Sequence, residues 1–567
     1  MRLPHLPALS ALFLVLSACS ESEIRTTEGR VRMDFHAELN ADEGWADSSD
    51  FITVRADSPF RLRFEVESSG PADGLGLEAR RNGGAWSRVL ARDFPYPDEI
   101  STPPVSIVSP AVWEAGATTR DLLGTSTQPF SGGAGLALDS LSEPVPAGQS
   151  EWEWAVVIRR WADGPEMMEA GDRFEFRMVA SSGAPLPGIG PITVRLGIPD
   201  GHLGGTYPET PGRLGPWQST DGRLWFPMEP AETFNVLMMM SSADKGRIWT
   251  EADGANRPAT DDLEGFATAY REGTIHILHQ ISERAVYHAF NTSDAPEGSE
   301  GWVVRDELVS DHPEPPVQTA ALEVLPDGTL VAVFAWGNRL EIRTKAPGGS
   351  WMPAEALAGR SAEGWILSGP QTVVTPDGLV HLAWTETNGT EGVLYHGTLN
   401  GSGVLGPTRV LATGLAGAES DVGSIAPLAF LPVDNEVAIV FRRAEGRLAE
   451  RRVGTDGSMT PEAIITERTV TQNAVDSDQV GADLIEYDGR LHLLFLDEET
   501  GSIFHTRSAE AGVWSAAEAV VEDIRGQWIR GQLVRKPDGR TVYGFVYDAG
   551  SDGGSGMNRY AEVDLGG

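Results

Sequence analysis

A unit of 50 to 57 residues recurs through the second part of this 567-residue chain. In each copy a tight turn, usually Asp-Gly, precedes a segment rich in apolar and β-branched residues. Asp-Gly and Asp-Asn tolerate the positive φ angles of a hairpin turn, so each copy predicts two strands joined by such a turn. The seven copies are DGRLWFPM (221–228), EGTIHILH (272–279), DGTLVAVF (327–334), DGLVHLAW (377–384), DNEVAIVF (434–441), DGRLHLLF (488–495) and DGRTVYGF (538–545).

Further apolar segments precede and follow these hairpins, which makes three or four strands in each unit. A repeat of this length and content is typical of a β-propeller, in which every unit forms one blade. The seven copies predict seven blades for residues 215–567, and six blades with an additional hairpin are the alternative. The last unit is short, so a strand near residues 192–218 is expected to complete its sheet.

Residues 19–198 lack this period and contain short alternating segments separated by turn residues. Such a pattern predicts antiparallel strands and a β-sandwich of immunoglobulin or carbohydrate-binding type. Residues 199–214, rich in Gly and Pro, are interpreted as a linker between the two domains. The predicted fold class is therefore all-β, an N-terminal β-sandwich followed by a propeller.

The N-terminus predicts export. A positively charged start with Arg2 precedes the apolar run 8–16, which is too short to span a bilayer and has the proportions of a secretory signal. The sequence Leu-Ser-Ala-Cys that ends at Cys19 resembles the lipobox of bacterial lipoproteins. The resemblance implies a signal peptide at 1–18, lipidation of Cys19 (the only cysteine) and, because Ser20 follows, an outer-membrane location in the cell envelope.

Composition and motifs exclude several classes of function. The formal net charge of −38 repels a phosphate backbone, so nucleic acid is not an expected partner. The chain contains no phosphate-binding loop, dinucleotide fingerprint, HExxH helix or nucleophile elbow. We accordingly expect neither a cofactor nor a metal ion.

One short motif connects the repeats with a known family. Residues 241–249, SSADKGRIW, place Ser242, Asp244, Gly246 and Trp249 in the order Ser-x-Asp-x-Gly-x-x-Trp. This order resembles the Asp box of BNR-repeat, sialidase-like propellers, and SAEAGVW (508–514) is a looser copy. The resemblance covers 215–567 and implies a propeller, with glycans as the class of ligand; the family includes glycosidases as well as non-catalytic binders.

The second repeat differs from the others in two ways. His279 stands where the other copies carry Met or an aromatic residue, and the preceding stretch contains Arg257, Asp262 and Glu264. Paired carboxyls are the requirement for glycoside cleavage, so the predicted catalytic residues are Asp262, Glu264 and His279. The predicted substrate-binding residues, at strand ends that would line a central funnel, are Arg257, Arg530, Trp217 and Gln318.

Six other histidines occupy two repeated positions, and we expect these to form structural hydrogen bonds within separate blades. They are His276, His381 and His492 on one strand, and His288, His396 and His505 on the next.

These observations predict a surface-anchored lipoprotein that acts on complex or acidic glycans as a glycoside hydrolase, similar to an exo-sialidase. The Phe/Tyr-Arg-Ile-Pro motif and an assignable arginine triad are missing from the sequence, so whether the chain is an enzyme stays open. A non-catalytic glycan- or protein-binding lipoprotein is the first alternative. A polysaccharide lyase that uses His279 and Arg257 is the second.

Overall fold

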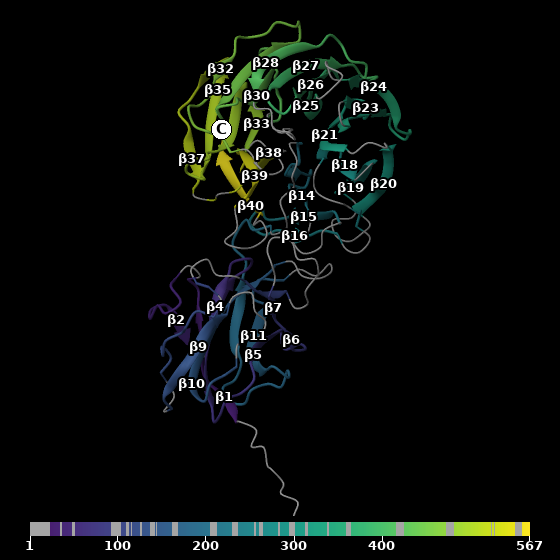
Figure 1. Cartoon of the computed structure of the whole chain (residues 1–567). Helices are drawn as coiled ribbons and strands as arrows, with labels where there is room; N and C mark the ends of the chain where they lie inside the picture. The colour runs from purple at the N-terminus through teal and green to yellow at the C-terminus, as the bar shows by residue number, and fades with distance from the viewer. Residues whose placement is uncertain are drawn as a thin grey trace, which may run out of the picture.

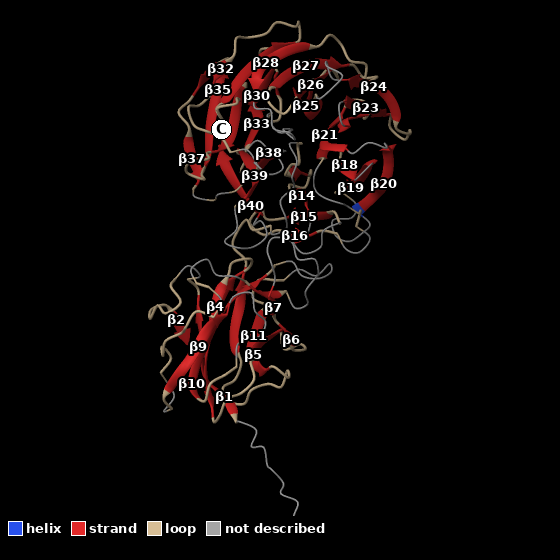
Figure 2. Ribbon diagram, in the orientation of Figure 1, coloured by secondary structure: helices blue, strands red, loops and turns tan. Residues whose placement is uncertain are grey.

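The computed structural model describes residues 23–566 apart from several stretches, the longest being 92–103, 137–141, 161–167, 204–211, 229–235, 260–264, 294–300, 359–364, 416–424, 472–480 and 550–557. The described residues form strands and loops, with a short 3₁₀ turn at Gly301 before β20 and no α-helix, which confirms the all-β fold class (Figure 1 and Figure 2). None of their helical turns approaches the length and hydropathy that a membrane-spanning helix needs.

Two sheets form the N-terminal part and share one apolar core. In one sheet the order is β2-β1-β4-β10-β8-β7 with β9 paired to β10, and in the other it is β3-β12-β11-β5-β6. The strands are β1 (Ile24–Arg32), β2 (Trp45–Asp47), β3 (Ile52–Arg55), β4 (Phe60–Ser68), β5 (Leu75–Arg81), β6 (Ser87–Arg88), β7 (Leu90–Ala91), β8 (Val105–Ile107), β9 (Phe130–Leu136), β10 (Gly148–Ile158), β11 (Arg173–Ala180) and β12 (Ile192–Gly197).

The outer face of the first sheet carries a buried ionic network. Arg61 pairs with Glu153, and Arg63 pairs with Glu151 at 2.5 Å and with Glu153 at 2.7 Å. The guanidinium of Arg61 also lies 4.4 Å from the ring centre of Trp113. Since each charged group has an opposite partner, these strands are buried on both faces at a tolerable desolvation cost.

The described residues from Trp217 to Asp564 form seven successive sheets. The first strands of neighbouring sheets contact one another, as β17 with β21 and β33 with β38, and Figure 1 shows them around a common centre. The first sheet comprises β13 (Trp217–Gln218), β14 (Leu224–Met228), β15 (Met238–Ser242) and β16 (Thr250–Glu251); the second β17 (Phe266–Arg271), β18 (Thr274–Ile281), β19 (Arg284–Asn291) and β20 (Trp302–Asp311); the third β21 (Pro316–Val324), β22 (Leu330–Trp336), β23 (Arg339–Lys345) and β24 (Met352–Ala358); the fourth β25 (Ile366–Val374), β26 (Val380–Thr387), β27 (Gly392–Leu399) and β28 (Arg409–Leu415); the fifth β29 (Ala429–Leu431), β30 (Glu436–Arg442), β31 (Leu448–Gly454) and β32 (Ala463–Ile464); the sixth β33 (Ala482–Tyr487), β34 (Arg490–Leu496), β35 (Ile503–Glu510), β36 (Val513–Trp514) and β37 (Glu518–Val521); and the seventh β38 (Ile529–Arg535), β39 (Thr541–Asp548) and β40 (Asn558–Asp564).

Two of the repeated turns have two consecutive residues with positive φ. Asp488 and Gly489 both have positive φ, 51° and 73°, in the two-residue hairpin between β33 and β34. Glu272 and Gly273 do the same between β17 and β18, at 49° and 82°. Two consecutive positive φ angles match the right-handed twist of the strands, so these turns set the register of the hairpins.

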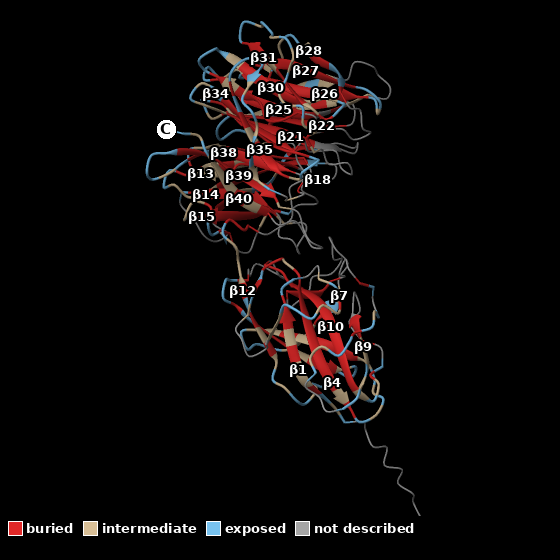
Figure 3. Ribbon diagram, turned by 90° about the vertical axis from the view of Figure 1, so that its left-hand side faces the viewer, coloured by how far each residue is buried: buried red, intermediate tan, exposed pale blue. Residues whose placement is uncertain are grey.

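Apolar side chains cover both faces of the sheets and fill the spaces between neighbours. Figure 3 shows that the strands consist largely of buried residues. Two tryptophan side chains contact residues of the adjacent sheet. The ring of Trp351 in the third sheet lies 5.5 Å from that of Tyr287 in the second, and Trp514 in the sixth sheet donates to Glu450 in the fifth at 2.7 Å.

The expectation that a segment near residues 192–218 completes the last sheet is confirmed. His202 forms an antiparallel bridge with Arg559 on β40. Leu203 N donates to Asn558 O at 2.9 Å, and Tyr560 N donates to Gly201 O at 2.8 Å. The chain that leaves the N-terminal sheets therefore pairs with the edge of the seventh sheet.

The Asp-box motif forms a closed turn at the edge of the first sheet. Asp244 Oδ1 accepts from Ile248 N at 2.8 Å and from Ser242 Oγ at 2.9 Å, while Gly246 O accepts from Trp249 Nε1 at 3.0 Å. The Trp249 ring is fully buried and packs 5.7 Å from Tyr560 of the seventh sheet. The motif thus joins the first and last sheets.

This geometry predicts a ranking of stabilities for three variants. Trp249→Ala leaves a cavity between two sheets and should lower the free energy of unfolding by about 3–5 kcal/mol. Asp244→Ala loses two hydrogen bonds and should cost about 1–2 kcal/mol. Glu510→Ala, at the exposed position of the looser copy, should cost less than about 0.5 kcal/mol. Denaturant titration checks the order, and an Asp244→Ala variant as stable as Glu510→Ala contradicts it.

Candidate functional site

The structure describes some of the predicted site residues and not others. Asp262, Glu264 and Cys19 lie outside the described residues, and Gln318 is placed only by its backbone in β21. His279, on β18, is fully buried, with its ring centre 5.3 Å from that of Phe266 and 6.4 Å from that of His288. The catalytic roles of Asp262, Glu264 and His279 therefore remain predictions.

The predicted substrate-binding residues have separate partners. Arg257 forms ion pairs with Glu251 and, at 3.2 Å, with Asp253 Oδ1. Arg530 Nε donates to the backbone oxygen of Gly212 at 3.0 Å, and Trp217 Nε1 donates to Thr268 Oγ1 at 2.8 Å. None of the described contacts links Arg257 with Arg530 or Trp217, so a shared funnel site is still a prediction.

The six repeated histidines are hydrogen bonded within their own sheets, as expected. His381 Nδ1 and His396 Nε2 are 3.0 Å apart, and His492 Nδ1 and His505 Nε2 are 3.1 Å apart. In the second sheet, His276 Nδ1 lies 2.6 Å from Tyr287 Oη, and His288 Nδ1 accepts from Asp306 N at 3.0 Å.

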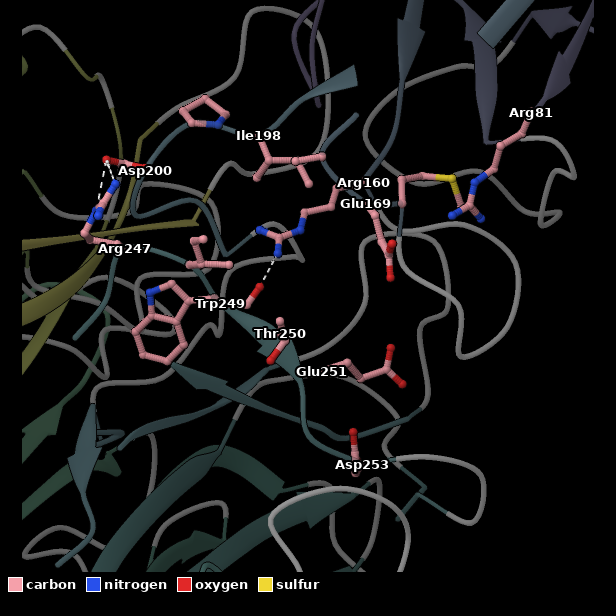
Figure 4. Close-up of a pocket in the computed structure, with 14 residues that line it drawn as sticks. Arg81, Arg160, Glu169, Ile198, Asp200, Arg247, Trp249, Thr250, Glu251 and Asp253 are labelled. Atoms are coloured by element: carbon pink, nitrogen blue, oxygen red, sulfur yellow. Dashed lines mark hydrogen bonds and ion pairs between the residues drawn. The ribbon is translucent and has the colours of Figure 1, made fainter. Parts of the chain in front are cut away.

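A cavity of about 670 Å³ lies where the N-terminal sheets meet the Asp-box turn (Figure 4). Its walls combine four carboxyls, three guanidinium groups and an apolar patch. Ile248, 59% exposed, belongs to the patch. The lining residues are Arg81, Arg160, Met168, Glu169, Ala170, Ile198, Pro199, Asp200, Arg247, Ile248, Trp249, Thr250, Glu251 and Asp253.

A buried polar joint forms the back of this cavity. Arg160 Nη2 donates to the backbone oxygen of Trp249 (Figure 4). Arg160 Nη1 donates to that of His202, so one guanidinium binds both the Asp-box turn and the segment that pairs with β40. His202 Nε2 lies 3.2 Å from Asp57 Oδ2. Burial opposes the ionisation of Asp57, but the hydrogen bond and charge of His202 and the charge of Arg159 hold its pKa below the usual value.

The most perturbed carboxyl in the cavity wall is Asp253. Burial raises its pKa to about 7, while the hydrogen bond from Trp302 Nε1 at 2.8 Å acts in the opposite direction. Glu251, two residues earlier, holds Arg257. Asp253 Oδ1 itself lies 3.2 Å from Arg257 Nη2, and the Asp253 side chain has no exposed surface.

Sequence reasoning missed Glu251, Asp253 and Arg160. The first two follow directly after the Asp box, in WTEAD (249–253), and this adjacency to a motif was the available signal. Arg160 ends a strand segment, WEWAVVIRR (152–160), that shows no functional pattern. Its role depends on contacts with residues far away in the chain, which no local pattern encodes.

One group of acidic side chains elsewhere has the spacing of metal ligands. Oxygen atoms of Glu65, Asp121 and Glu151 lie within 4.8 Å of one another in the N-terminal part. Protein donors already engage them, since Glu65 accepts from Gln149 at 2.6 Å and Glu151 pairs with Arg63. We therefore assign no metal to this group.

Comparisons with known proteins find likenesses of structure alone. No protein-family model and no curated protein sequence matches the chain. Similar solved structures include a lectin from Burkholderia pseudomallei (11% identity, 63% of this chain and 97% of the other, TM-score 0.42). An ulvan lyase, a polysaccharide lyase, has 9% identity over 65% and 94% of the two chains with a TM-score of 0.42, and a Hadza microbial sialidase has 12% over 95% and 93% with 0.34. Because these sequence identities and TM-scores are low, the similarity does not indicate which ligand this chain binds.

The buried histidines predict that acid destabilises the protein. Burial lowers the pKa to about 4 for His276, His381, His492 and His505 and to about 3 for His288 and His396. Below about pH 6.5 the unfolded chain binds protons that the folded chain does not, so the free energy of unfolding falls as pH decreases. Asp253 and Asp483 partly offset this fall in the free energy of unfolding, because their raised pKa values let the folded chain bind protons first.

Calorimetry should show a Tm lower by about 5 °C or more at pH 5 than at pH 7. The double variant with His381→Gln and His396→Gln keeps hydrogen-bonding groups but removes two sites of proton uptake, and its Tm should change less with pH. A wild-type Tm that is equal or higher at pH 5 is incompatible with this account.

Proposed function

We propose that this chain is a lipoprotein of the cell envelope that binds a glycan in the cavity between its two β-domains. In this proposal residues 19–198 are a β-sandwich, and residues 215–567 are a seven-bladed, sialidase-like propeller. The seven successive sheets with contacting first strands support the seven blades. The common core of the two N-terminal sheets supports the sandwich.

The observation that carries the glycan proposal is the chemistry of the cavity wall. A sugar presents hydroxyl groups that both donate and accept, together with apolar C–H faces. Carboxylates supply acceptors and guanidinium groups supply donors, and both line the cavity. The exposed Ile248 offers an apolar surface beside them, and a volume of about 670 Å³ is within the usual range of ligand pockets.

Glycoside hydrolysis is the second candidate function, and the raised pKa of Asp253 favours it. A general acid must hold its proton near neutral pH, and a second carboxyl must act as nucleophile or base. Asp253 and Glu251 would supply this pair. We place binding ahead of hydrolysis because the Asp253 side chain is covered and its carboxylate accepts from Trp302.

A glycan panel tests both functions with the intact protein in detergent. We expect binding by calorimetry that weakens at least tenfold in Glu169→Gln and in Ile248→Asp, because both side chains are exposed in the cavity wall. Glu499→Gln, an exposed carboxyl of the sixth sheet, is the matched control and should bind normally.

Product analysis on the same panel separates the two candidates. Binding without turnover supports the first; turnover that Asp253→Asn abolishes while binding persists supports the second. Neither binding nor turnover across neutral, sialylated and uronate-containing glycans would refute both.

The lipid anchor is tested separately. Lipidation at Cys19 should place the protein in the detergent phase of a temperature-induced phase separation and should incorporate labelled fatty acid. Cys19→Ser removes the acceptor sulfur and should shift the protein to the aqueous phase without label. Unlabelled wild-type protein in the aqueous phase contradicts the anchor.

A further inference from the structure

The outer face of the second N-terminal sheet is rich in arginine. In β11 the side chains of Phe174, Phe176 and Met178 belong to the buried apolar core. Because side chains alternate between the two faces of a strand, the residues between them point outward. By the same alternation, the outward-facing charged residues of β3, β5, β6, β11 and β12 are Arg55, Glu78, Arg80, Arg88, Arg173, Glu175, Arg177 and Arg195.

The charge of this surface, here called the arginine face, is opposite to that of the whole chain. Six of its charged residues are arginines and two are glutamates. The chain has 44 basic and 82 acidic residues and a formal net charge of −38. A positive patch on such an acidic protein attracts anions locally while the remaining surface repels them. The overall composition therefore does not account for the arginine face.

The two glutamates neutralise only part of this positive charge. Glu175 binds two guanidinium groups, that of Arg80 at 2.8 Å and that of Arg173 at 3.1 Å, and Glu78 binds Arg177 at 2.7 Å. The Arg173 side chain is still 52% exposed. A guanidinium group has five N–H donors, so an arginine that is paired with one carboxylate can bind a second anion.

Two arginines lie directly opposite one another on neighbouring strands. Arg173 of β11 and Arg195 of β12 are Cα partners in the antiparallel register, and both are exposed. Like charges in directly opposite positions destabilise a sheet. An anionic group that binds both guanidinium groups would remove this repulsion, so the arrangement favours a bound anion over a bare surface.

The Trp86 side chain packs against two of the other arginines. The centre of its ring lies 4.6 Å from Arg80 Cζ and 4.1 Å from Arg177 Cζ. A guanidinium group that packs on an aromatic ring has less conformational freedom to lose when it binds a ligand. Part of the arginine face is therefore ordered before any ligand arrives.

The chemistry of the arginine face fits a polymer that carries carboxylates. The planar guanidinium group binds a carboxylate through two parallel hydrogen bonds. A membrane fits less well, because membrane-binding surfaces combine basic residues with exposed apolar ones. Among the described residues, the large exposed apolar side chains lie outside the five strands of this sheet. A membrane would also face the acidic remainder of the protein, whereas a single polymer can follow the arginines alone.

We propose that the arginine face is a binding surface for an acidic polysaccharide, whose uronate carboxylates bind Arg173, Arg195 and the neighbouring guanidinium groups. The face adjoins the cavity described above, because Arg81 at the end of β5 and Ile198 directly after β12 both line that cavity. The two sites are nevertheless separate, and binding to the arginine face requires no ligand in the cavity.

Polygalacturonate, a polymer of uronate residues, is the probe, and neutral dextran is its uncharged counterpart. Calorimetry with the intact protein in detergent should show binding of polygalacturonate that weakens as salt is added, and no binding of dextran. The double variant with Arg173→Gln and Arg195→Gln loses charge-assisted hydrogen bonds, so its affinity should fall at least about tenfold. Its Tm should not fall, because the substitutions also remove the repulsion between opposite like charges.

The matched control is the double variant with Arg490→Gln and Arg507→Gln. It changes the net charge equally, at two exposed arginines of the sixth sheet, and should bind polygalacturonate as the wild type does. Glu169→Gln, in the cavity wall, should also bind normally, which separates the arginine face from the proposed glycan cavity.

Three results would overturn the proposal. The first is the absence of salt-sensitive binding to polygalacturonate, and the second is an equal loss of affinity in the control pair or a loss in Glu169→Gln alone. The third concerns the membrane. If the Cys19→Ser protein binds vesicles that contain phosphatidylglycerol through Arg173 and Arg195 but does not bind polygalacturonate, the partner is a lipid surface.

Discussion

The backbone pairing of residues 201–203 with β40 is the interaction on which the remaining contacts between the two parts of the molecule depend. Without it, β40 would present an unpaired edge, the kind of edge that recruits other chains. The pairing also sets the position of His202, whose backbone oxygen and ring meet Arg160 and Asp57. Arg160 in turn reaches the backbone of Trp249, so the Asp-box turn and the cavity beside it are held by the same joint.

Much of the fold could be predicted because its signals are local and repeated. The turns recur every 50 to 57 residues, and Asp488 and Gly489 have the positive φ angles that such a hairpin turn requires. The turn formed by the Asp box could be predicted because all its hydrogen bonds lie within nine residues, from Ser241 to Trp249. Repeated histidines could be assigned to structural bonds because equivalent positions in different sheets cannot meet at one point.

The candidate site could be predicted only in part because its contacts join distant segments. Arg257 could be singled out from the sequence, and it contacts Glu251 and Asp253, which line the cavity. These two acidic residues could not be, because they lie just after the Asp box and belong to no motif of their own. The Gly and Pro content of residues 199–214 predicts no more than a linker. Its pairing with β40 and its place among the first strands depend on residues hundreds of positions later, which composition does not encode.

The pairing of residues 201–203 with β40 also has a consequence for biosynthesis. The chain emerges from the ribosome N-terminus first, so the early segment must wait for the last strand before its hydrogen bonds can form. Contacts of such high sequence separation slow folding, and the open edge is exposed throughout translation of the intervening sheets.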